Sequence, residues 1–305
     1  MTKLSIVIVS WNTCDLLVAC LASVFKYQPA ASFEVWVIDN YSSDDSVLMV
    51  RDRFPQVRLI ENKNNVGFAQ ANNQAIELCQ GQYILLLNPD TEVKENALDA
   101  LISFLDENPQ AGGAGSRLLN PNGTLQRSCH PAPTLKREFW RLFHMDALRL
   151  YGAYDMYQWD TALPREVDVL QGASLMVRKE ILDAIGFMDG DYFMYSEEVD
   201  LCFRIQQAGW KLYWVPVSQV THYGGQSTKQ VQTEMFLQLY LGKLKYFRKH
   251  YGRFAGMCYK LLLLWASLIR VIFSPIGLLY KPPMRKRIFV LASQYQRLLG
   301  ALLRM

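Results

Sequence analysis

Short apolar runs alternate with segments of helical apolar periodicity in the N-terminal third of the chain. The runs at residues 4–9, 35–38, 57–60 and 83–87 predict buried strands, and residues 16–24, 43–53 and 69–79 predict helices between them. Parallel strands require connections of this length, usually through a helix. The alternation therefore predicts an α/β domain whose sheet is mainly parallel, with right-handed crossovers.

The stretch from Tyr83 to Glu92 organises this part of the sequence. Five apolar residues end at Asn88-Pro89-Asp90, where the proline cannot donate to a strand ladder and stops the strand. Asp90 then lies at the carboxyl end of a central strand, where ligands of open α/β sheets bind. A carboxylate there suits Mg²⁺ or Mn²⁺ held together with phosphate oxygens. The alternative is an Asn-Pro-Asp turn that caps the next helix.

The pattern changes after a predicted helix at 97–108. Residues 118–125 predict a hairpin with Asn122-Gly123 at its turn, and residues 129–165 form an irregular, aromatic-rich segment typical of a lid or binding loop. Further predictions are strands at 167–170, 174–177 and 211–215, and helices at 179–185 and 197–208. No internal repeat or low-complexity segment interrupts this order.

Several polar residues follow the predicted strands and are candidates for binding. Asp39 can accept hydrogen bonds from a base or ribose, or can form an Asx-turn near Ser42. Asn65, Gly67 and Asn73 occupy a loop and helix start that suit a phosphate, although ordinary helix capping gives the same pattern. His222 is one of four histidines, and a lone histidine is more often structural than a ligand.

The start of the predicted helix at 197–208 is strongly acidic. Glu197, Glu198 and Asp200 follow Ser196, and the group is consistent with helix-dipole stabilisation and an Asp200–Arg204 pair. Adjacent carboxylates near apolar side chains should also have one raised pKa, which suits a general base.

Charge divides the chain into two regions. Residues 226–305 contain fourteen Lys or Arg and one acidic residue, Glu234, for a net charge of +13, whereas residues 1–225 have eighteen basic and twenty-seven acidic residues, for −9. The basic region requires an anionic partner. Its apolar segment 257–280 is interrupted by Lys260, Arg270 and Pro275, which favours helices lying in a membrane interface over a span of roughly 20 residues. A helical packing or dimerisation surface is the alternative, and no nucleic-acid-binding motif accompanies the charge.

Compartment follows from the cysteines and the N-terminus. The six cysteines form no CxxC pair and no disulfide-rich spacing, which predicts a reduced, cytosolic chain. Residues 4–9 are too short for the apolar core of a signal peptide and are expected to form the first strand.

The order of these motifs resembles the family 2 glycosyltransferases of the GT-A fold, over about residues 1–225. The most specific segments are residues 8–12 (IVSWN), 65–73 (NVGFAQANN), 87–90 (LNPD) and 193–201 (FMYSEEVDL), and they look most like bacterial rhamnosyltransferases that act on lipid-linked saccharides. The resemblance implies a mixed, mainly parallel sheet flanked by helices, with residues 1–225 as the catalytic domain and residues 226–305 as a basic, amphipathic helical appendage.

The resemblance also implies roles for residues. A nucleotide-sugar site would include Asp39, Asn65, Gly67, Asn73, Asn88 and Asp90. Asp90 would be the remaining aspartate of the family's DxD motif, with Asn88 in place of the first, and His222 would complete a site for Mn²⁺ or Mg²⁺. Glu198 would be the catalytic base in place of the family's aspartate, with Asp200 as the fallback. Gln171, Gly172, Asp189 and Glu197 would lie on the acceptor side.

The expected activity is inverting, metal-dependent transfer of a sugar, most simply rhamnose from dTDP-rhamnose, to a lipid-linked saccharide in bacterial surface polysaccharide synthesis. Another donor such as galactofuranose or a hexosamine, a nucleotidyltransferase, and a non-catalytic nucleotide-sugar-binding protein are the alternatives. The expected location is peripheral, on an anionic membrane at the cytoplasmic face of the inner membrane. A homo-oligomer is possible, and no nucleic-acid partner is expected.

Overall fold

The computed structural model describes residues 2–226 and 228–305, which form two compact units. The first unit consists of residues 1–132 and 154–230, and the second of residues 133–153 and 231–305. The second unit therefore includes a stretch that the sequence hypothesis assigned to the catalytic domain, and its main boundary follows residue 230 where 225 was expected.

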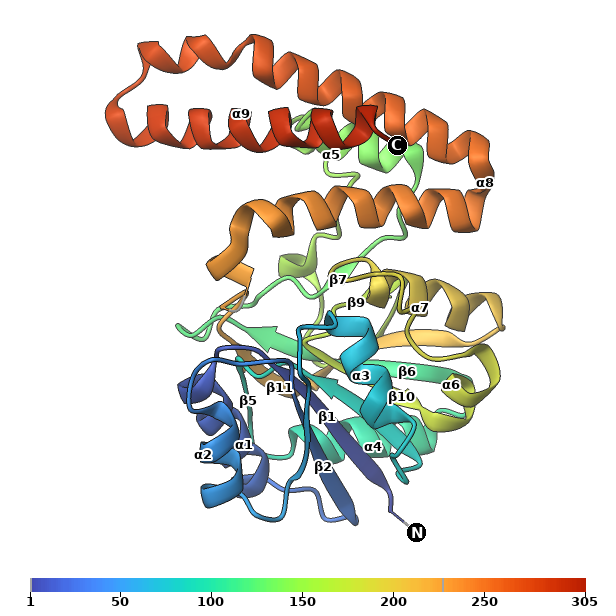
Figure 1. Ribbon diagram of the computed structural model, residues 1–305. Helices are drawn as coiled ribbons and strands as arrows, with labels where there is room; N and C mark the ends of the chain where they lie inside the picture. Colours follow the sequence, from blue (N-terminus) through green and yellow to red (C-terminus); the bar gives the residue numbers. More distant parts are fainter. Residues whose placement is uncertain (1, 227) are drawn as a thin grey trace. The chain divides into compact units, whose positions relative to one another are not determined.

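The first unit is built on a mixed sheet in which six strands run in the same direction (Figure 1). The strand order is β3 (Arg58–Glu61), β2 (Phe33–Asp39), β1 (Leu4–Ser10), β4 (Tyr83–Leu87), β10 (Ser174–Arg178), β6 (Ala111–Leu119), β11 (Lys211–His222) and β5 (Thr91–Val93), with β8 (Arg165–Val167) beside β11. β10, β5 and β8 are antiparallel to their neighbours. A separate ladder pairs β7 (Cys129–His130) with β9 (Val169–Leu170).

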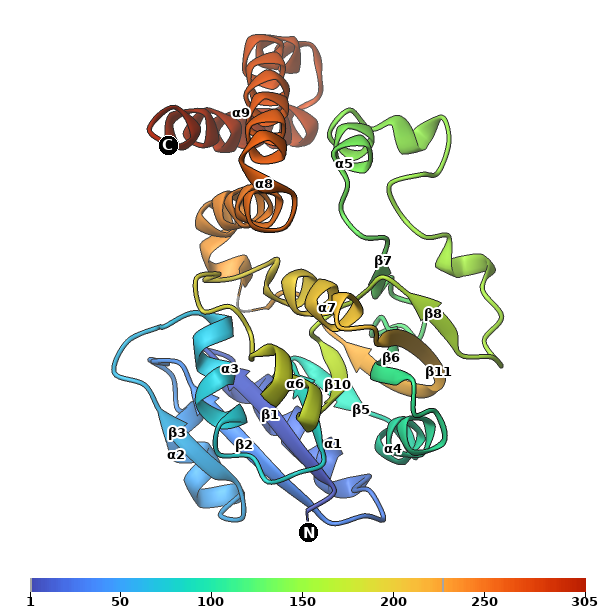
Figure 2. The same cartoon turned by 90° about the vertical axis from the view of Figure 1, so that its right-hand side faces the viewer.

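Helices cover both faces of this sheet, as the buried runs of its strands require (Figure 2). One face packs against α1 (Cys14–Lys26), α2 (Ser46–Arg53) and α4 (Ala97–Glu107). The other packs against α3 (Phe68–Ile76), α6 (Lys179–Ile185) and α7 (Glu197–Gln207), and the short η2 (Met156–Gln158) contributes Met156 to the same core. All residues of β1 and β4 are buried, which explains their uninterrupted apolar runs.

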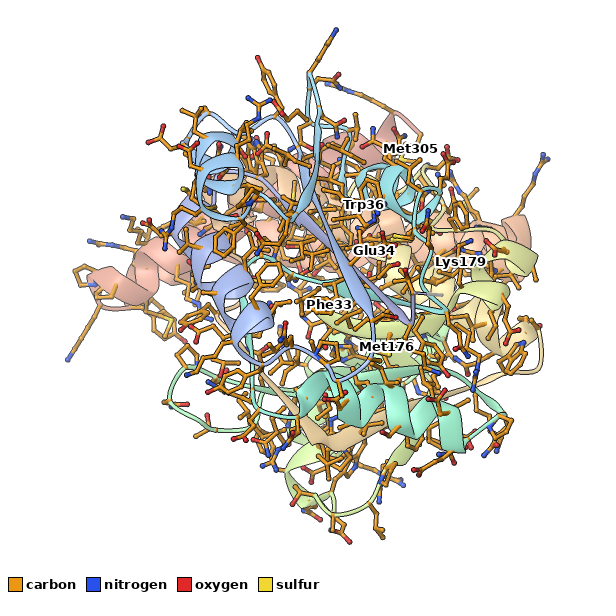
Figure 3. The ribbon with its side chains drawn as sticks, turned by 90° about the horizontal axis from the view of Figure 1, so that it is seen from below. Phe33, Glu34, Trp36, Met176, Lys179 and Met305 are labelled. Atoms are coloured by element: carbon orange, nitrogen blue, oxygen red, sulfur yellow. The ribbon has the colours of Figure 1, made fainter. Side chains whose placement is uncertain are left out.

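The amino ends and the carboxyl ends of the parallel strands lie at opposite edges of the sheet. Figure 3 views one end from below, where Phe33 and Glu34 begin β2 and Lys179 begins α6 after β10. This is the amino end of the parallel strands, because Arg178 of β10 pairs with Tyr83, the first residue of β4. The carboxyl ends of β1, β2, β4, β6 and β11 therefore meet at the opposite edge.

The second unit is helical. It contains α5 (Leu135–Leu142), η1 (Met145–Ala147), α8 (Gln232–Ile272), η4 (Ser274–Leu279) and α9 (Pro282–Leu303), and η3 (Thr228–Val231) precedes α8. Gly252 has φ 85° and ψ 173°, so α8 is two helical segments joined at a kink. Tyr295, Leu298 and Leu302 of α9 are buried, and the hydroxyls of Tyr240 and Tyr295 lie 3.0 Å apart.

Most predicted elements of the first unit are confirmed, with ends that move by a few residues. The hairpin is also confirmed, since Leu119 bridges Leu125 and the amide of Asn120 donates to the carbonyl of Thr124. Two expectations are wrong. β11 continues through an irregularity between Val215 and Gln219 to His222, where the strand was expected to stop at 215. Residues 135–142 are not irregular but form α5. Thr134 is its N-cap residue, and the side chain of Thr134 accepts from the amide of Arg137.

Candidate active site

Asp90 and His222 lie side by side at the carboxyl edge of the sheet. β4 ends before Asn88, and β11 ends at His222, which pairs with Thr91 of β5. The amide of Tyr223 donates to the carbonyl of Asp90, which brings the two segments together. As a result Oδ1 of Asp90 is 3.3 Å from Nε2 of His222. The expected approach of these two side chains is confirmed.

Both side chains are almost fully buried, at 5% and 3% exposure. Burial raises the pKa of the Asp90 carboxyl, but the neighbouring His222 imidazole and the amide of Gln226 outweigh burial and lower it. The carboxyl is therefore an anion at neutral pH. Nε2 of His222 makes no directed hydrogen bond, so a buried ring nitrogen faces a carboxylate without a partner between them.

This arrangement fits a divalent cation that is held mainly by its substrate. Two adjacent ligands of an octahedral ion at about 2.1 Å lie about 3 Å apart, close to the observed separation. Within residues 2–226 and 228–305, no group of three or more His, Cys, Asp or Glu side chains could hold a metal. Asp90 and His222 are thus two candidate ligands from the described part of the chain, as in Mg²⁺ sites where phosphate oxygens and water complete the shell.

The two carboxylate oxygens of Asp39 have different environments. Its Oδ2 accepts from the amide of Ser42 at 3.0 Å, the Asx-turn that the sequence allowed. Its Oδ1 is buried and has no hydrogen-bond partner. A buried carboxylate oxygen without a donor is costly, so this atom is suited to accept from a ligand at the sheet edge.

Asn40 organises the loop beside Asp39, and sequence reasoning did not identify it. Its Nδ2 donates to Oδ1 of Asn65 at 2.8 Å, and its Oδ1 accepts from the amide of Val66 and from Nδ2 of Asn62. The same Oδ1 of Asn65 accepts from the amide of Gly67 at 3.0 Å. The position of Asn40 directly after Asp39, ahead of an Asn-rich loop, was the available signal.

Gly67 and Asn73 have structural contacts that differ from their expected nucleotide contacts. Gly67 has φ +85°, and a Cβ there would lie 2.6 Å from the carbonyl oxygen of Phe193. Asn73 donates to the carbonyl of Met188 at 2.7 Å and accepts from the same residue's amide. Both residues thus hold the segment before α7 against α3, and their roles toward a nucleotide remain predictions.

The acidic start of α7 places three carboxyl groups in different environments. Glu197 is buried, and burial, followed by the charge of Glu198, raises the pKa of its carboxyl well above the ordinary value. Asp200 is completely buried and pairs with Arg204, Oδ2 to Nε at 2.7 Å. Arg204 also donates to the carbonyls of Ile185, Gly186 and Phe187. Asp200 therefore has a structural ion pair, whereas Glu198 is partly exposed.

Short contacts connect the start of α7 to the Asp90 segment. A Cβ added at Gly172 would lie 3.7 Å from Cβ of Glu198, an ordinary van der Waals contact, so the two residues are neighbours. The next residue, Ala173, accepts through its carbonyl from the amide of Asn88 at 3.1 Å. The structure thus brings Glu198, Gly172, Asn88 and Asp90 to one region.

The remaining predicted acceptor residues have backbone or turn contacts. The amide of Gln171 donates to the carbonyl of Ser128 at 2.9 Å. Oδ1 of Asp189 accepts from the amide of Asp191 at 2.9 Å, in the turn before α7.

Comparisons with known proteins identify the family of this chain. The model of the family described as glycosyl transferase family 2 matches residues 5–171. The chain is 30% identical over 213 residues to the N-acetylglucosaminyl-diphospho-decaprenol L-rhamnosyltransferase of Mycobacterium tuberculosis, covering 64% of this chain and 67% of that protein. It is 26% identical over 178 residues to the rhamnosyltransferase WbbL of Escherichia coli K12, covering 56% of this chain and 66% of that protein.

Solved structures show the same fold. The mannosyltransferase PcManGT of Pyrobaculum calidifontis, in complex with GDP-Man and Mn²⁺, superposes with a TM-score of 0.57 at 15% identity, covering 99% of this chain and 86% of that one. GalNAc-T7 with UDP, GalNAc and Mn²⁺ gives 0.55 at 19% identity, covering 73% and 44%. These similarities establish a GT-A-like architecture. With the match over residues 5–171, they show that the chain belongs to glycosyltransferase family 2.

Proposed function

We propose that this enzyme transfers rhamnose from dTDP-rhamnose, with inversion, to a lipid-linked saccharide in the synthesis of a surface polysaccharide. The observation that supports it most is the 3.3 Å approach of Asp90 and His222 at the carboxyl edge of the sheet. The donor and acceptor are inferred from the likeness to relatives named as rhamnosyltransferases, one of which acts on a diphospho-decaprenol substrate.

In this proposal Asp90 and His222 hold Mn²⁺ or Mg²⁺, which when bound stabilises the negative charge of the leaving diphosphate. Asp39 accepts hydrogen bonds from the nucleoside through Oδ1. Asn65, Gly67, Asn73 and Asn88 shape the donor side, directly or through the loop contacts described above.

Glu198 is the proposed general base. It takes the proton of the acceptor hydroxyl while the acceptor oxygen bonds to the anomeric carbon and the bond from that carbon to the diphosphate breaks. The partial exposure of Glu198 allows an acceptor to reach it, whereas the ion pair of Asp200 with Arg204 argues against the fallback. Gln171, Gly172, Asp189 and Glu197 are proposed to line the acceptor side.

The helical unit is proposed to hold the enzyme on the membrane that contains its acceptor. Exposed apolar side chains recur every three or four residues along the second segment of α8: Phe254, Met257, Leu261, Trp265, Leu268 and Ile272. Exposed basic residues flank them, including Arg253, Lys281, Arg285, Lys286 and Arg287. This composition is typical of helices that lie in the interface of an anionic membrane.

A spanning helix is the alternative arrangement. Among the described residues, α8 alone is long and apolar enough to cross a membrane, by length and composition only. The kink at Gly252 and the basic residues favour a peripheral position on the cytoplasmic face.

The experiment that tests the reaction is product analysis with purified protein, Mn²⁺, dTDP-rhamnose and a lipid-diphosphate saccharide. Release of dTDP with a glycosylated lipid is expected. Release of pyrophosphate would indicate a nucleotidyltransferase, and binding without turnover a nucleotide-sugar-binding protein. A thermal-shift screen of nucleotide sugars identifies the donor, since a bound ligand raises the melting temperature. Asp90→Ala is expected to abolish the Mn²⁺-dependent part of that shift.

Sedimentation with liposomes tests the membrane part. The protein is expected to sediment with anionic vesicles and to be released by high salt. Each well-placed Lys or Arg should contribute about 1 kcal/mol to the binding free energy. Equal binding to neutral vesicles would remove the electrostatic part, and a requirement for detergent would favour insertion. No binding to either would favour a packing surface between protein chains.

A further inference from the structure

Gln126 contacts the ring of His222 from the side opposite Asp90. Its Oε1 lies 2.6 Å from Nδ1 of His222. Its Nε2 donates to the backbone carbonyl of the same histidine at 3.1 Å and to Oδ1 of Asn120 at 3.0 Å. One amide side chain therefore holds both the ring and the backbone of His222.

The direction of these hydrogen bonds follows from backbone groups. The carbonyl of His222 can only accept, so the group of Gln126 that faces it must be the NH₂, and Oε1 faces Nδ1. Asn120 is oriented in the same way, because its Nδ2 donates to the carbonyl of Leu125 at 3.3 Å and its Oδ1 is left to accept. An amide oxygen has no proton to give, so Nδ1 of His222 must carry the hydrogen.

This tautomer has a consequence at the other ring nitrogen. With the hydrogen on Nδ1, Nε2 is the ring nitrogen whose lone pair is available to a cation, and this atom lies buried 3.3 Å from Oδ1 of Asp90. A histidine binds a metal through such a nitrogen, and the hydrogen bond at the other nitrogen determines which one is free.

The hairpin around residues 118–126 places Gln126. β6 and β11 run parallel, and their pairing ends at Leu119 with Thr221, one residue before His222. The chain then turns at Asn120 and returns, so that the amide of Gln126 donates to the carbonyl of Leu118 at 2.8 Å. The turn thus brings a residue 96 positions away in sequence against the imidazole.

We propose that Gln126 is a positioning residue that keeps His222 in its Nδ1–H tautomer and presents Nε2 to the cation. Asn120 in turn orients Gln126, because its Oδ1 accepts from Nε2 of Gln126. This inference rests on the proposed metal site of Asp90 and His222. It adds a residue that fixes the tautomer and orientation of His222 before any ion binds.

The first test needs no metal and no measurement of activity. Nitrogen-15 NMR of the histidine side chains, in metal-free protein at a pH at which the rings are neutral, reports which nitrogen is protonated. The chain has four histidines, and His222→Gln identifies the signal in question. We expect a protonated Nδ1 and an unprotonated Nε2 in the wild type, and a shift toward the Nε2–H form in Gln126→Leu. A wild-type ring protonated at Nε2 alone would overturn the inference.

The second test measures Mn²⁺ affinity in the presence of dTDP, by calorimetry or by the electron paramagnetic resonance signal of free Mn²⁺. Loss of a partner of a metal-binding histidine costs about 10- to 100-fold in metal affinity, and we expect Gln126→Leu to fall in this range. Gln126→Glu keeps an oxygen that accepts from Nδ1 and should retain most of the affinity. Equal affinities for Gln126→Leu and wild type would overturn the inference.

Asn122→Ala is the matched control. Asn122 lies in the same turn, where its Oδ1 accepts from the amide of Thr124 at 3.1 Å, and it has no hydrogen bond to Gln126. We expect this variant to keep both the tautomer and the affinity, within about twofold. An equal loss in Asn122→Ala would mean that the hairpin as a whole matters and Gln126 does not.

The two tests also separate this inference from the proposed function. A wild-type protein that binds no Mn²⁺ with dTDP would overturn the metal-dependent function and, with it, the presentation of Nε2 to a cation. A protein that binds Mn²⁺ normally while His222 is in the Nε2–H form would overturn the role of Gln126 alone.

Discussion

Two glutamates in different units of the molecule are buried to the same degree and have opposite electrostatic environments. Glu197 at the start of α7 is 3% exposed, and Glu138 in α5 is 1% exposed. The pKa of the Glu197 carboxyl is raised well above its usual range by burial and then by the charge of Glu198. Burial also raises the pKa of the Glu138 carboxyl, but Lys243, Arg141 and Tyr259 outweigh it and lower the pKa.

The difference lies in the partners. Glu138 lies 2.8 Å from Nζ of Lys243 and 3.4 Å from Arg141, and the hydroxyl of Tyr259 is 3.5 Å from its Oε2. Within residues 2–226 and 228–305 no ion pair with Glu197 is found, and its Oε2 is buried without a hydrogen bond. A buried carboxyl with compensating partners stabilises packing, whereas a second carboxyl beside a buried one raises its pKa further. Burial alone therefore does not distinguish a structural acid from one in the proposed active site.

The largest expected effect is that of Glu198, the carboxyl next to Glu197 at the start of α7. Glu198→Gln should lower kcat by about 10²- to 10⁴-fold, the usual contribution of a general base, with little change in the affinity for the nucleotide sugar. Steady-state kinetics together with donor binding by calorimetry check this. Turnover close to wild type would move the role of base to Asp200 or Glu197.

The next effect concerns the partnered glutamate. Lys243→Met removes the closest cation from Glu138 and leaves a buried charge less compensated, which costs roughly 3–5 kcal/mol when an ion pair is broken on one side. Faster hydrogen exchange at the amides of α5 and α8 should accompany a lower melting temperature. Lys281→Met, at an exposed lysine directly before α9, is the control, and equal destabilisation by both variants would argue against a specific ion pair.

The pH dependence of stability should have opposite signs for the two acids. The pKa of Glu138 is lowered on folding, so its stabilisation is present above the ordinary value of about 4.3 and is lost as the pH falls through the folded value. The pKa of Glu197 is raised, so between about 4.3 and its folded value the unfolded chain loses the proton first and stability falls as pH rises.

Variants isolate these two contributions. Glu197→Gln should stabilise the protein relative to wild type as pH increases, while Glu138→Gln should destabilise it at neutral pH and less in acid. Each unit of pKa difference corresponds to about 1.4 kcal/mol. Denaturant unfolding at a series of pH values measures both, and the same sign for the two variants would refute the comparison.

The smallest expected effect is that of the Tyr259 hydroxyl. Tyr259→Phe removes one donor at 3.5 Å from Glu138 and keeps the ring, which packs 4.7 Å from that of Phe247. The cost should be about 0.5–1.5 kcal/mol in the free energy of unfolding. A loss as large as that of Lys243→Met would show that the hydroxyl is the main partner of the carboxyl.

Local patterns in the sequence were sufficient for much of the first unit. The apolar runs predicted β1 to β4, Pro89 predicted the end of β4, and the spacing of turn residues predicted the hairpin at 118–125, because strand and turn preferences act over a few neighbouring residues. The motif order also identified the family to which the chain belongs. Asp90 and His222 were expected to meet because each follows a strand of one sheet, and they do.

Contacts across long sequence separations depended on the tertiary structure. The direction of β10 and β5 is set by which strands they pair with, so their apolar runs alone did not reveal that they are antiparallel. α5 was not predicted because one of its buried positions is the acidic Glu138, which pairs with Lys243 of α8. A local hydrophobic pattern assigns such a residue to the exposed face. Gln126 gave no signal at all, since its importance arises when the parallel pairing of β6 with β11 brings it to His222, 96 residues away. Periodicity encodes which residues turn inward, but only the strand order of the sheet decides which inward residues meet.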